Sequence, residues 1–276
     1  LAFYAAKGQI SPGAPDHFPP PLRVMDCGAL QYLPHLYQYA GNGYLLVSDR
    51  GEGLVVDPHL PELPVLDKLL EEVGVWPTAM VVSHYHYDHS DGIAPLREKY
   101  GAKAWLHPWL AEILKRPEQA FRPWLRSYPI TADKLWPERG TWPWAEYEFQ
   151  VAPWPGQTWW HCAFMTVVDG QKVLFAGDSF TPTSRWNGTG GFCAYNHSRF
   201  HDGFVPSAQL VLDWAPDFMA AGHGNYYRFA PGKFRAIMRW ARQAEQAVRD
   251  LCPSGDLEQD YYSVRAVLRR QAGARG

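Results

Sequence analysis

The chain has 276 residues, of which 46% are hydrophobic and 20% charged, with 24 glycines and 24 prolines, as in a folded globular protein with many loops. A formal net charge of −2, with Lys and Arg scattered along the chain, offers no global attraction to nucleic acid. No apolar run reaches the roughly 18 residues that a membrane span needs, so we expect neither a nucleic-acid partner nor a membrane span.

The cysteines and the first residues bear on the compartment. Cys27, Cys162, Cys193 and Cys252 lie far apart without a CxxC pair, so neither a cysteine zinc knuckle nor a dense disulfide scaffold is indicated. Residues 1–22 are too polar and proline-rich for a signal peptide, so we expect a cytoplasmic location. The chain begins with Leu1 rather than Met, which is also compatible with a processed or excised piece.

The first half of the chain alternates predicted strands and helices. Residues 1–22 form an irregular N-terminal arm, and residues 23–276 one domain with a C-terminal helical extension. A β-hairpin is predicted over 36–59, and strands are predicted at 78–83 and 102–107. Apolar residues at helical spacing predict helices over 61–75, 92–101 and 108–116. This rhythm is typical of an α/β fold.

The second half continues this alternation after a long predicted loop. Residues 121–145, crowded with Trp and Pro, favour an ordered loop or cap. Strands are predicted at 147–155, 162–170, 172–178 and 217–224, and helices over 206–216 and 231–252, with a weaker helix over 256–276. Tryptophans dense enough to roof a pocket lie between 124 and 160, although packing within a loop-rich layer is the favoured interpretation.

A histidine cluster, "SHYHYDH", follows the predicted strand at 78–83. His84 and His86 are two residues apart, so both side chains point the same way at the mouth of a strand and can chelate one cation. Asp88 and His89 lie just beyond, where a turn directs them at a second cation. Imidazole with carboxylate suits zinc, and also iron or manganese. Such density costs desolvation free energy unless a cation offsets it, so a metal site is predicted.

This cluster resembles the HxHxDH signature of the metallo-β-lactamase superfamily, and "FAGDSF" and "AAGHG" resemble its later Asp and His motifs in the same order. The resemblance covers roughly residues 30 to 250. It implies an αβ/βα four-layer sandwich, with two mixed β-sheets flanked by helices and a binuclear metal site at one edge. It also implies that His84 and His86 hold the first metal, that Asp88, His89 and His223 hold the second, and that Asp178 bridges both. In having an aspartate at position 178, the sequence resembles the glyoxalase II branch of the superfamily.

The third ligand of the first metal departs from the family pattern. The family segment PGHTxGH is "PGQTWWH" here, so Gln157 stands where the ligating histidine is usual and His161 matches the second, usually non-ligating one. Three alternatives stay open. Gln157 binds through its amide oxygen, His161 turns in, or the protein works with one metal.

The resemblance implies a metal-dependent hydrolase that uses a metal-bound hydroxide on a small ester-, thioester- or lactone-like substrate. Asp88 and Asp178 are the predicted catalytic residues, and two divalent metals, first of all zinc, are the predicted cofactors. Trp159, Trp160, Tyr226 and Arg228 are candidates for the substrate pocket. The alternatives are a mononuclear iron oxidoreductase of the persulfide dioxygenase kind and a non-catalytic binding module stabilised by metal.

Overall fold

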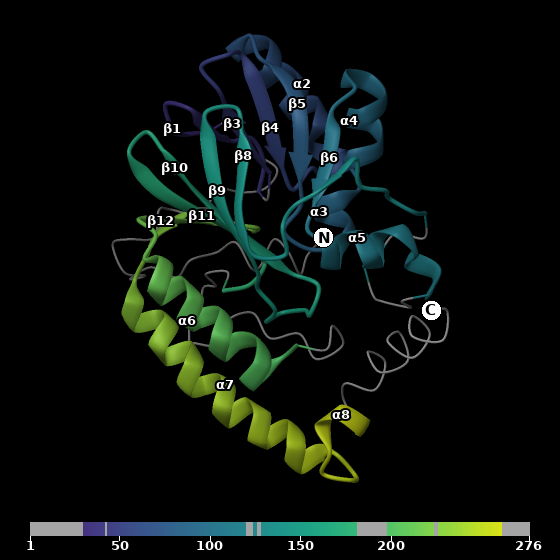
Figure 1. Ribbon diagram of the computed structural model, residues 1–276, viewed down its shortest axis with the longest axis vertical. Coiled ribbons are helices and arrows are strands. Elements are labelled where there is room, and N and C mark those ends of the chain that lie inside the picture. The colour runs from purple at the N-terminus through teal and green to yellow at the C-terminus, as the bar shows by residue number, and fades with distance from the viewer. Residues whose placement is uncertain are drawn as a thin grey trace.

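Two mixed β-sheets pack face to face in the computed structural model, which describes residues 30–41, 43–119, 124–125, 128–180, 198–223 and 226–260. The first sheet has the strand order β1-β2-β3-β4-β5-β6-β7, and the second has the order β13-β12-β11-β10-β9-β8. Helices lie outside both sheets (Figure 1), which confirms the predicted four-layer α/β sandwich.

The first sheet changes from antiparallel to parallel pairing at its middle. Its strands are β1 (Leu30–Leu33), β2 (Leu36–Gln38), β3 (Tyr44–Val47), β4 (Glu52–Val56), β5 (Trp76–Val81), β6 (Lys103–Leu106) and β7 (Lys134–Leu135). β1 to β4 pair antiparallel, whereas β4 to β7 pair parallel. Parallel neighbours need crossover connections, and α2 (Leu63–Val73) and α4 (Ile93–Tyr100) supply them. The carboxyl ends of β4 and β5 therefore lie at the same edge.

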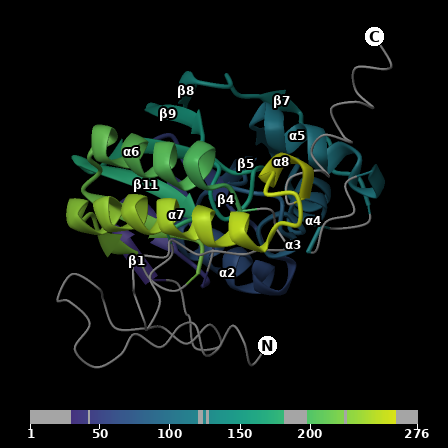
Figure 2. The same cartoon turned by 90° about the horizontal axis from the view of Figure 1, so that it is seen from below.

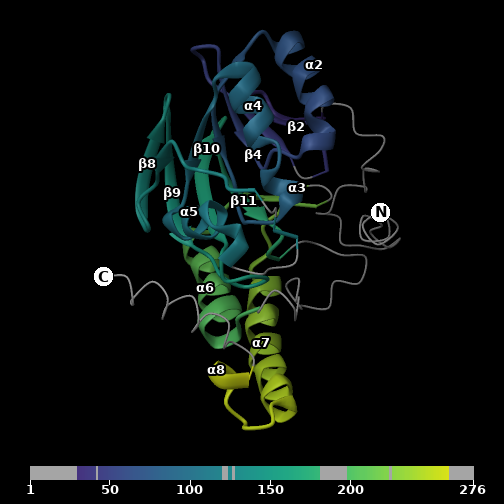
Figure 3. The ribbon, with the colours of Figure 1, turned by 90° about the vertical axis from the view of Figure 1, so that its right-hand side faces the viewer.

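The crossover helix α2 shows how local sequence sets these connections. A proline occupies its first turn, and Gly74 ends it in the left-handed conformation at φ 73°. Leu66, Leu69 and Leu70 recur at helical spacing and are buried. Figure 3 shows α2 and α4 close together in the upper part of the molecule.

The second sheet is formed by β8 (Gly140–Trp144), β9 (Tyr147–Pro153), β10 (Cys162–Val168), β11 (Gln171–Gly177), β12 (Phe218–Ala221) and β13 (Tyr227–Arg228). β8 to β11 form an antiparallel meander, and β12 pairs parallel with β11 after the crossover through α6 (Val205–Trp214). The carboxyl ends of β11 and β12 thus also lie together. The other helices among the described residues are the long α7 (Pro231–Leu251) and the shorter α3 (Tyr87–Ser90), α5 (Pro108–Lys115) and α8 (Leu257–Asp260). Three further short helical turns are η1 (Leu60–Glu62), η2 (Pro117–Gln119) and η4 (Phe200–Phe204).

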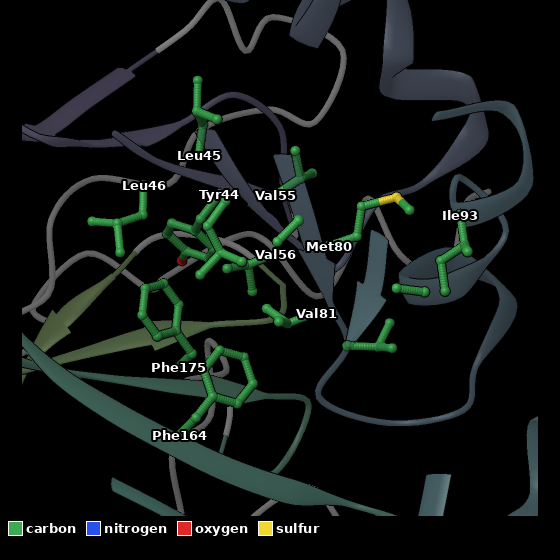
Figure 4. Close-up of a cluster of buried hydrophobic side chains, with 14 of the residues drawn as sticks. Tyr44, Leu45, Leu46, Val55, Val56, Met80, Val81, Ile93, Phe164 and Phe175 are labelled. Atoms are coloured by element: carbon green, nitrogen blue, oxygen red, sulfur yellow. The ribbon is translucent and has the colours of Figure 1, made fainter. Parts of the chain in front are cut away.

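Alternate residues of the central strands face different layers. On β10, Phe164 belongs to the core between the sheets, whereas its neighbours Ala163 and Met165 belong to the core beneath α6 and α7. Figure 4 shows Tyr44, Val56 and Val81 of the first sheet facing Phe164 and Phe175 of the second. Figure 2 shows α6 and α7 running alongside each other in front of β11. A strand buried on both faces explains why its sequence is a nearly continuous apolar run.

The segment 121–145 differs from the predicted loop or cap. It contains β7 and β8, and Trp136, Trp142 and Trp144 pack in the core between the sheets. Pro143 suggested a loop, but β8 is an edge strand, and an edge strand tolerates a residue without an amide N–H. The tryptophans here therefore mostly stabilise the sandwich instead of roofing a pocket.

Some sequence predictions fall outside the described residues. The irregular arm at 1–22 is one of them, so the domain limits stay a prediction, and so does the helical extension beyond residue 260. Within the part of the chain that the structure describes, none of the helices has both the length and the apolar character needed to cross a membrane.

Candidate metal centre

The predicted metal ligands lie where the carboxyl ends of four strands meet. His84, His86 and His89 follow β5, Asp178 follows β11 and His223 follows β12. Pairing of β4 with β5 and of β11 with β12 is parallel, so these ends lie at the same edge of each sheet. Figure 1 shows β4, β5 and β6 pointing toward the end of the sandwich where α3 begins.

The first cluster consists of His84, His86 and Asp178, all of them buried. Nε2 of His84 lies 2.9 Å from Nδ1 of His86. The same two nitrogens lie 3.6 and 4.0 Å from Oδ2 of Asp178. Two imidazole nitrogens and a carboxylate oxygen that converge in this way can hold a divalent cation.

The second cluster consists of Asp88, His89 and His223. Nε2 of His223 lies 3.2 Å from Oδ2 of Asp88, and Nε2 of His89 lies 3.7 Å from the same oxygen. Oδ1 of Asp178 is 3.2 Å from Nε2 of His223 and 3.3 Å from Nε2 of His89. Asp178 thus presents one oxygen to each cluster, so its carboxylate could contact a cation held in either of them.

The protonation of the site fits a cation. Burial lowers the pKa of His84 well below its ordinary 6.5, and the rings of His89 and His86 lower it further, so His84 is a neutral imidazole ready to bind metal. At His223 burial opposes the charged ring, but Asp178 and Asp88 outweigh it and raise the pKa to about 9. Burial would raise the pKa of Asp178, yet His223, His89 and His84 hold it well below its ordinary value. The carboxylates are therefore ionised. A divalent cation can supply the positive charge that protons on the neighbouring histidines otherwise supply.

A buried aspartate that the sequence analysis did not select, Asp57, holds two of the histidines in place. Its Oδ2 lies 3.0 Å from Nδ1 of His89 and accepts a hydrogen bond from Ser83 Oγ at 2.7 Å. Oγ of Ser83 in turn lies 3.0 Å from Nδ1 of His84. Both histidines are thereby fixed with Nε2 toward the clusters. Its place at the end of β4, parallel to β5, was the signal that could have identified Asp57.

The sequence profile of the metallo-beta-lactamase superfamily matches residues 36–228, which is more than half of the chain. The chain belongs to the metallo-β-lactamase superfamily. Its clustered histidines and aspartates lie at one edge of the fold that this superfamily shares.

Curated members of the superfamily give a closer comparison. The hydroxyacylglutathione hydrolase of Albidiferax ferrireducens is 31% identical over 156 residues, which cover 54% of this chain and 51% of that protein. The hydroxyacylglutathione hydrolase of Xanthomonas oryzae pv. oryzae is 31% identical over 137 residues, 49% of this chain and 45% of that protein. The chain thus spans about half the length of the curated relatives it matches.

Solved structures of the superfamily share the fold. BJP-1, a subclass B3 metallo-β-lactamase of Bradyrhizobium japonicum, superposes with a TM-score of 0.58 at 14% sequence identity, covering 81% of this chain and 94% of that one. At this identity the likeness concerns the architecture alone, and it agrees with the two mixed sheets and flanking helices seen here.

The two candidates for the third ligand occupy different places. Gln157 lies beside the first cluster, where its Nε2 donates to Oδ2 of Asp178 at 3.2 Å. His161 lies parallel to His84, with 5.0 Å between ring centroids, and its Nδ1 contacts the Cys162 carbonyl at 3.2 Å. Both side chains are buried.

The four candidate pocket residues are dispersed. Trp160 is 5% exposed and packs edge-on against Tyr85 in the core. Trp159 stacks on Trp109 at 4.7 Å, beside a cavity of about 430 Å³.

The other two candidate pocket residues, Tyr226 and Arg228, lie at the edge of the second sheet. The ring of Tyr226 lies 3.8 Å from that of Tyr32, and the guanidinium of Arg228 lies over the ring of Phe218. Trp124 instead contacts the metal cluster, because its ring lies 5.0 Å from that of His86. A role in substrate binding stays a prediction for these residues.

Proposed function

We propose that the protein is a two-metal hydrolase that cleaves small thioesters of the hydroxyacylglutathione type. The observation that carries the proposal is Asp178, whose two oxygens each face one cluster of potential ligands. The thioester follows from the curated relatives, which are hydroxyacylglutathione hydrolases. The match covers 51% of the Albidiferax ferrireducens protein, so the substrate is a proposal.

The proposed first site consists of His84, His86 and Asp178, and the proposed second site of Asp88, His89 and His223 with Asp178. When bound, a divalent metal pair supplies a water of lowered pKa and polarises the substrate carbonyl. The chain's own contribution is to place the carboxylate of Asp88 at the edge of the centre, where it is 7% exposed and lies 3.2 Å from Nε2 of His223. Asp88 can orient the attacking water and accept its proton.

The overall reaction consumes one water and needs no further reactant. The water oxygen forms a bond to the thioester carbonyl carbon, the carbon–sulfur bond breaks, and the sulfur leaves with the electron pair. The proton removed from the water goes to the thiolate, so the products are a carboxylic acid and a thiol. The ring of Trp124 beside His86 offers an apolar surface to the acyl part.

The test is hydrolysis of an S-hydroxyacylglutathione by zinc-loaded protein. The reaction is measured by the thiol that it releases. We expect turnover, and we expect Asp88→Asn to reduce kcat/KM by roughly 10²- to 10⁴-fold because the proton acceptor is lost. Asp67→Asn is the matched control, since Asp67 contacts Lys99 and Tyr100 away from the clusters. Zinc-loaded protein that hydrolyses an ester, lactone or β-lactam but no thioester would contradict the proposed substrate.

A further inference from the structure

We infer that Gln157 supplies the third protein donor of the first metal site through the oxygen of its side-chain amide, and that His161 does not. The inference rests on the proposed metal centre but not on its substrate. It settles the three alternatives that the sequence "PGQTWWH" leaves open, and it predicts that the two metal sites of this protein differ in affinity.

The first support is the position of the amide. Nε2 of Gln157 lies 3.2 Å from Oδ2 of Asp178, the oxygen that faces His84 and His86 at 3.6 and 4.0 Å. The amide group is therefore one hydrogen bond away from the point where the other donors converge. The Gln157 side chain is 4% exposed, so the amide is held inside the site rather than in solvent.

The second support is an unsatisfied oxygen. Oε1 of Gln157 is buried and has no hydrogen-bond partner among the described residues. A buried amide oxygen without a partner costs on the order of 1–3 kcal/mol, so such an atom calls for a ligand. Rotation of the amide by 180° exchanges Oε1 with Nε2 without moving the backbone, which turns an oxygen toward the first cluster.

The third support is the rigid backbone around Gln157. Oγ of Ser198 donates to the Gln157 carbonyl at 2.8 Å, and the amide of Arg199 donates to the Gly156 carbonyl at 3.0 Å. The Gly156 amide closes the turn on the Thr158 carbonyl at 3.0 Å. A side chain that starts from a fixed backbone loses less conformational entropy when it binds a metal.

His161 is poorly placed for the same role. One ring nitrogen, Nδ1, is occupied by the Cys162 carbonyl. The other, Nε2, has no partner among the described residues either, but it faces Gly177, where an added Cβ would lie 2.7 Å away. The β-bridge between His84 and His161 fixes the backbone at this point. His161 would have to leave its place behind His84 to reach the cluster.

An amide oxygen makes the first site weaker than a histidine would. The amide is a harder and less basic donor than imidazole, and like imidazole it carries no charge. The second site keeps Asp88, His89 and His223, together with Asp178, so its donors match the family pattern. We therefore expect one tight and one weaker metal per chain.

The experiment is a titration of metal-free protein with Zn²⁺ in competition with a chromophoric chelator. The variants are Gln157→Met, which removes the oxygen at similar volume, Gln157→Glu, which replaces the amide by a carboxylate, and His161→Asn as the matched control. The asparagine amide can keep the contact to the Cys162 carbonyl. Metal per chain is counted independently by plasma mass spectrometry.

We expect Gln157→Met to lower the affinity for one zinc by roughly 10- to 100-fold. Gln157→Glu should raise the affinity for the same zinc by about tenfold or more. His161→Asn should leave both affinities unchanged. The gain in Gln157→Glu cannot arise from misfolding, and circular dichroism checks the other variants. A parent with a single zinc supports the inference only if Gln157→Glu binds two.

Two results would overturn the inference. One is loss of a zinc in His161→Asn with both Gln157 variants unchanged, and the other is identical zinc binding in all four proteins. Since the titration contains no substrate, these outcomes are independent of the proposed thioesterase activity. A protein with the expected zinc pattern that hydrolyses no thioester would keep the ligand assignment and lose the proposed function.

Discussion

Single carboxylates at this centre each serve more than one partner. Asp178 presents one oxygen to each cluster, and Asp57 binds both Ser83 and His89. The sequence spacing alone predicted His84 as a ligand, because residues two apart on a strand share a face. It did not single out Asp57, whose contacts depend on the parallel pairing of β4 with β5 and leave no local pattern.

At this scale we predict the effect of Asp57→Asn. The two oxygens of Asp57 accept from the Ser83 amide at 2.6 Å and from Ser83 Oγ at 2.7 Å, and one of them faces Nδ1 of His89 at 3.0 Å. An asparagine turns one of these oxygens into a donor, which loosens the orientation of His89 and of His84. We expect zinc affinity to fall by roughly 10- to 100-fold, measured by chelator competition.

Asp67→Asn is the control for this prediction as well, because Asp67 is a helix-surface aspartate whose hydrogen-bond partners are Lys99 and Tyr100. Zinc binding by Asp57→Asn that equals that of the control would show that Asp57 does not position the ligands.

Helices and strands were predicted correctly from the sequence wherever their local signals agreed with one another. Pro108 in the first turn and apolar residues at helical spacing predicted α5 within a residue of its observed end, and the structure buries Leu110 and Ile113. The edge strand β8 was missed, because Pro143 argues against a strand until the strand is known to lie at an edge. Position in the sheet is a tertiary property, so the chain around β8 does not display it.

The beginning of α5 carries a prediction about pH. Nδ1 of His107 accepts from the Trp109 amide at 3.2 Å, and Nε2 donates to the Glu138 carbonyl at 2.9 Å, so the neutral ring satisfies both contacts. Burial lowers the pKa of His107 below its ordinary 6.5, although the Glu138 carbonyl offsets part of the effect. As the pH falls through about 6.5, the unfolded chain takes up a proton that the folded chain resists, so the free energy of unfolding decreases.

The measurement is urea unfolding between about pH 7 and pH 5. We expect the parent to lose stability toward the acid end and His107→Asn to lose less, because asparagine also caps a helix but does not titrate in this window. An unchanged slope in His107→Asn would mean that this ring contributes nothing to the acid sensitivity.

In the whole molecule, two sheets bring together side chains that are far apart in the sequence. Tyr44 of the first sheet donates to the Ala221 carbonyl of the second at 2.8 Å, next to the strand end that carries His223. The alternation of strands and helices predicted an α/β fold, and the family resemblance carried by the HxHxDH motif implied the sandwich. The place of Gln157 could not be predicted, because sequence position does not say whether a side chain points toward a cluster or away from it.

In the proposed centre, two metal ions share Asp178. The most direct measurement is anomalous diffraction at the zinc absorption edge from crystals of the protein grown with zinc. We expect two peaks per chain, one beside His84 and His86, the other beside Asp88, His89 and His223, with Asp178 between them. A single peak, or peaks that do not flank Asp178, would contradict a two-metal centre.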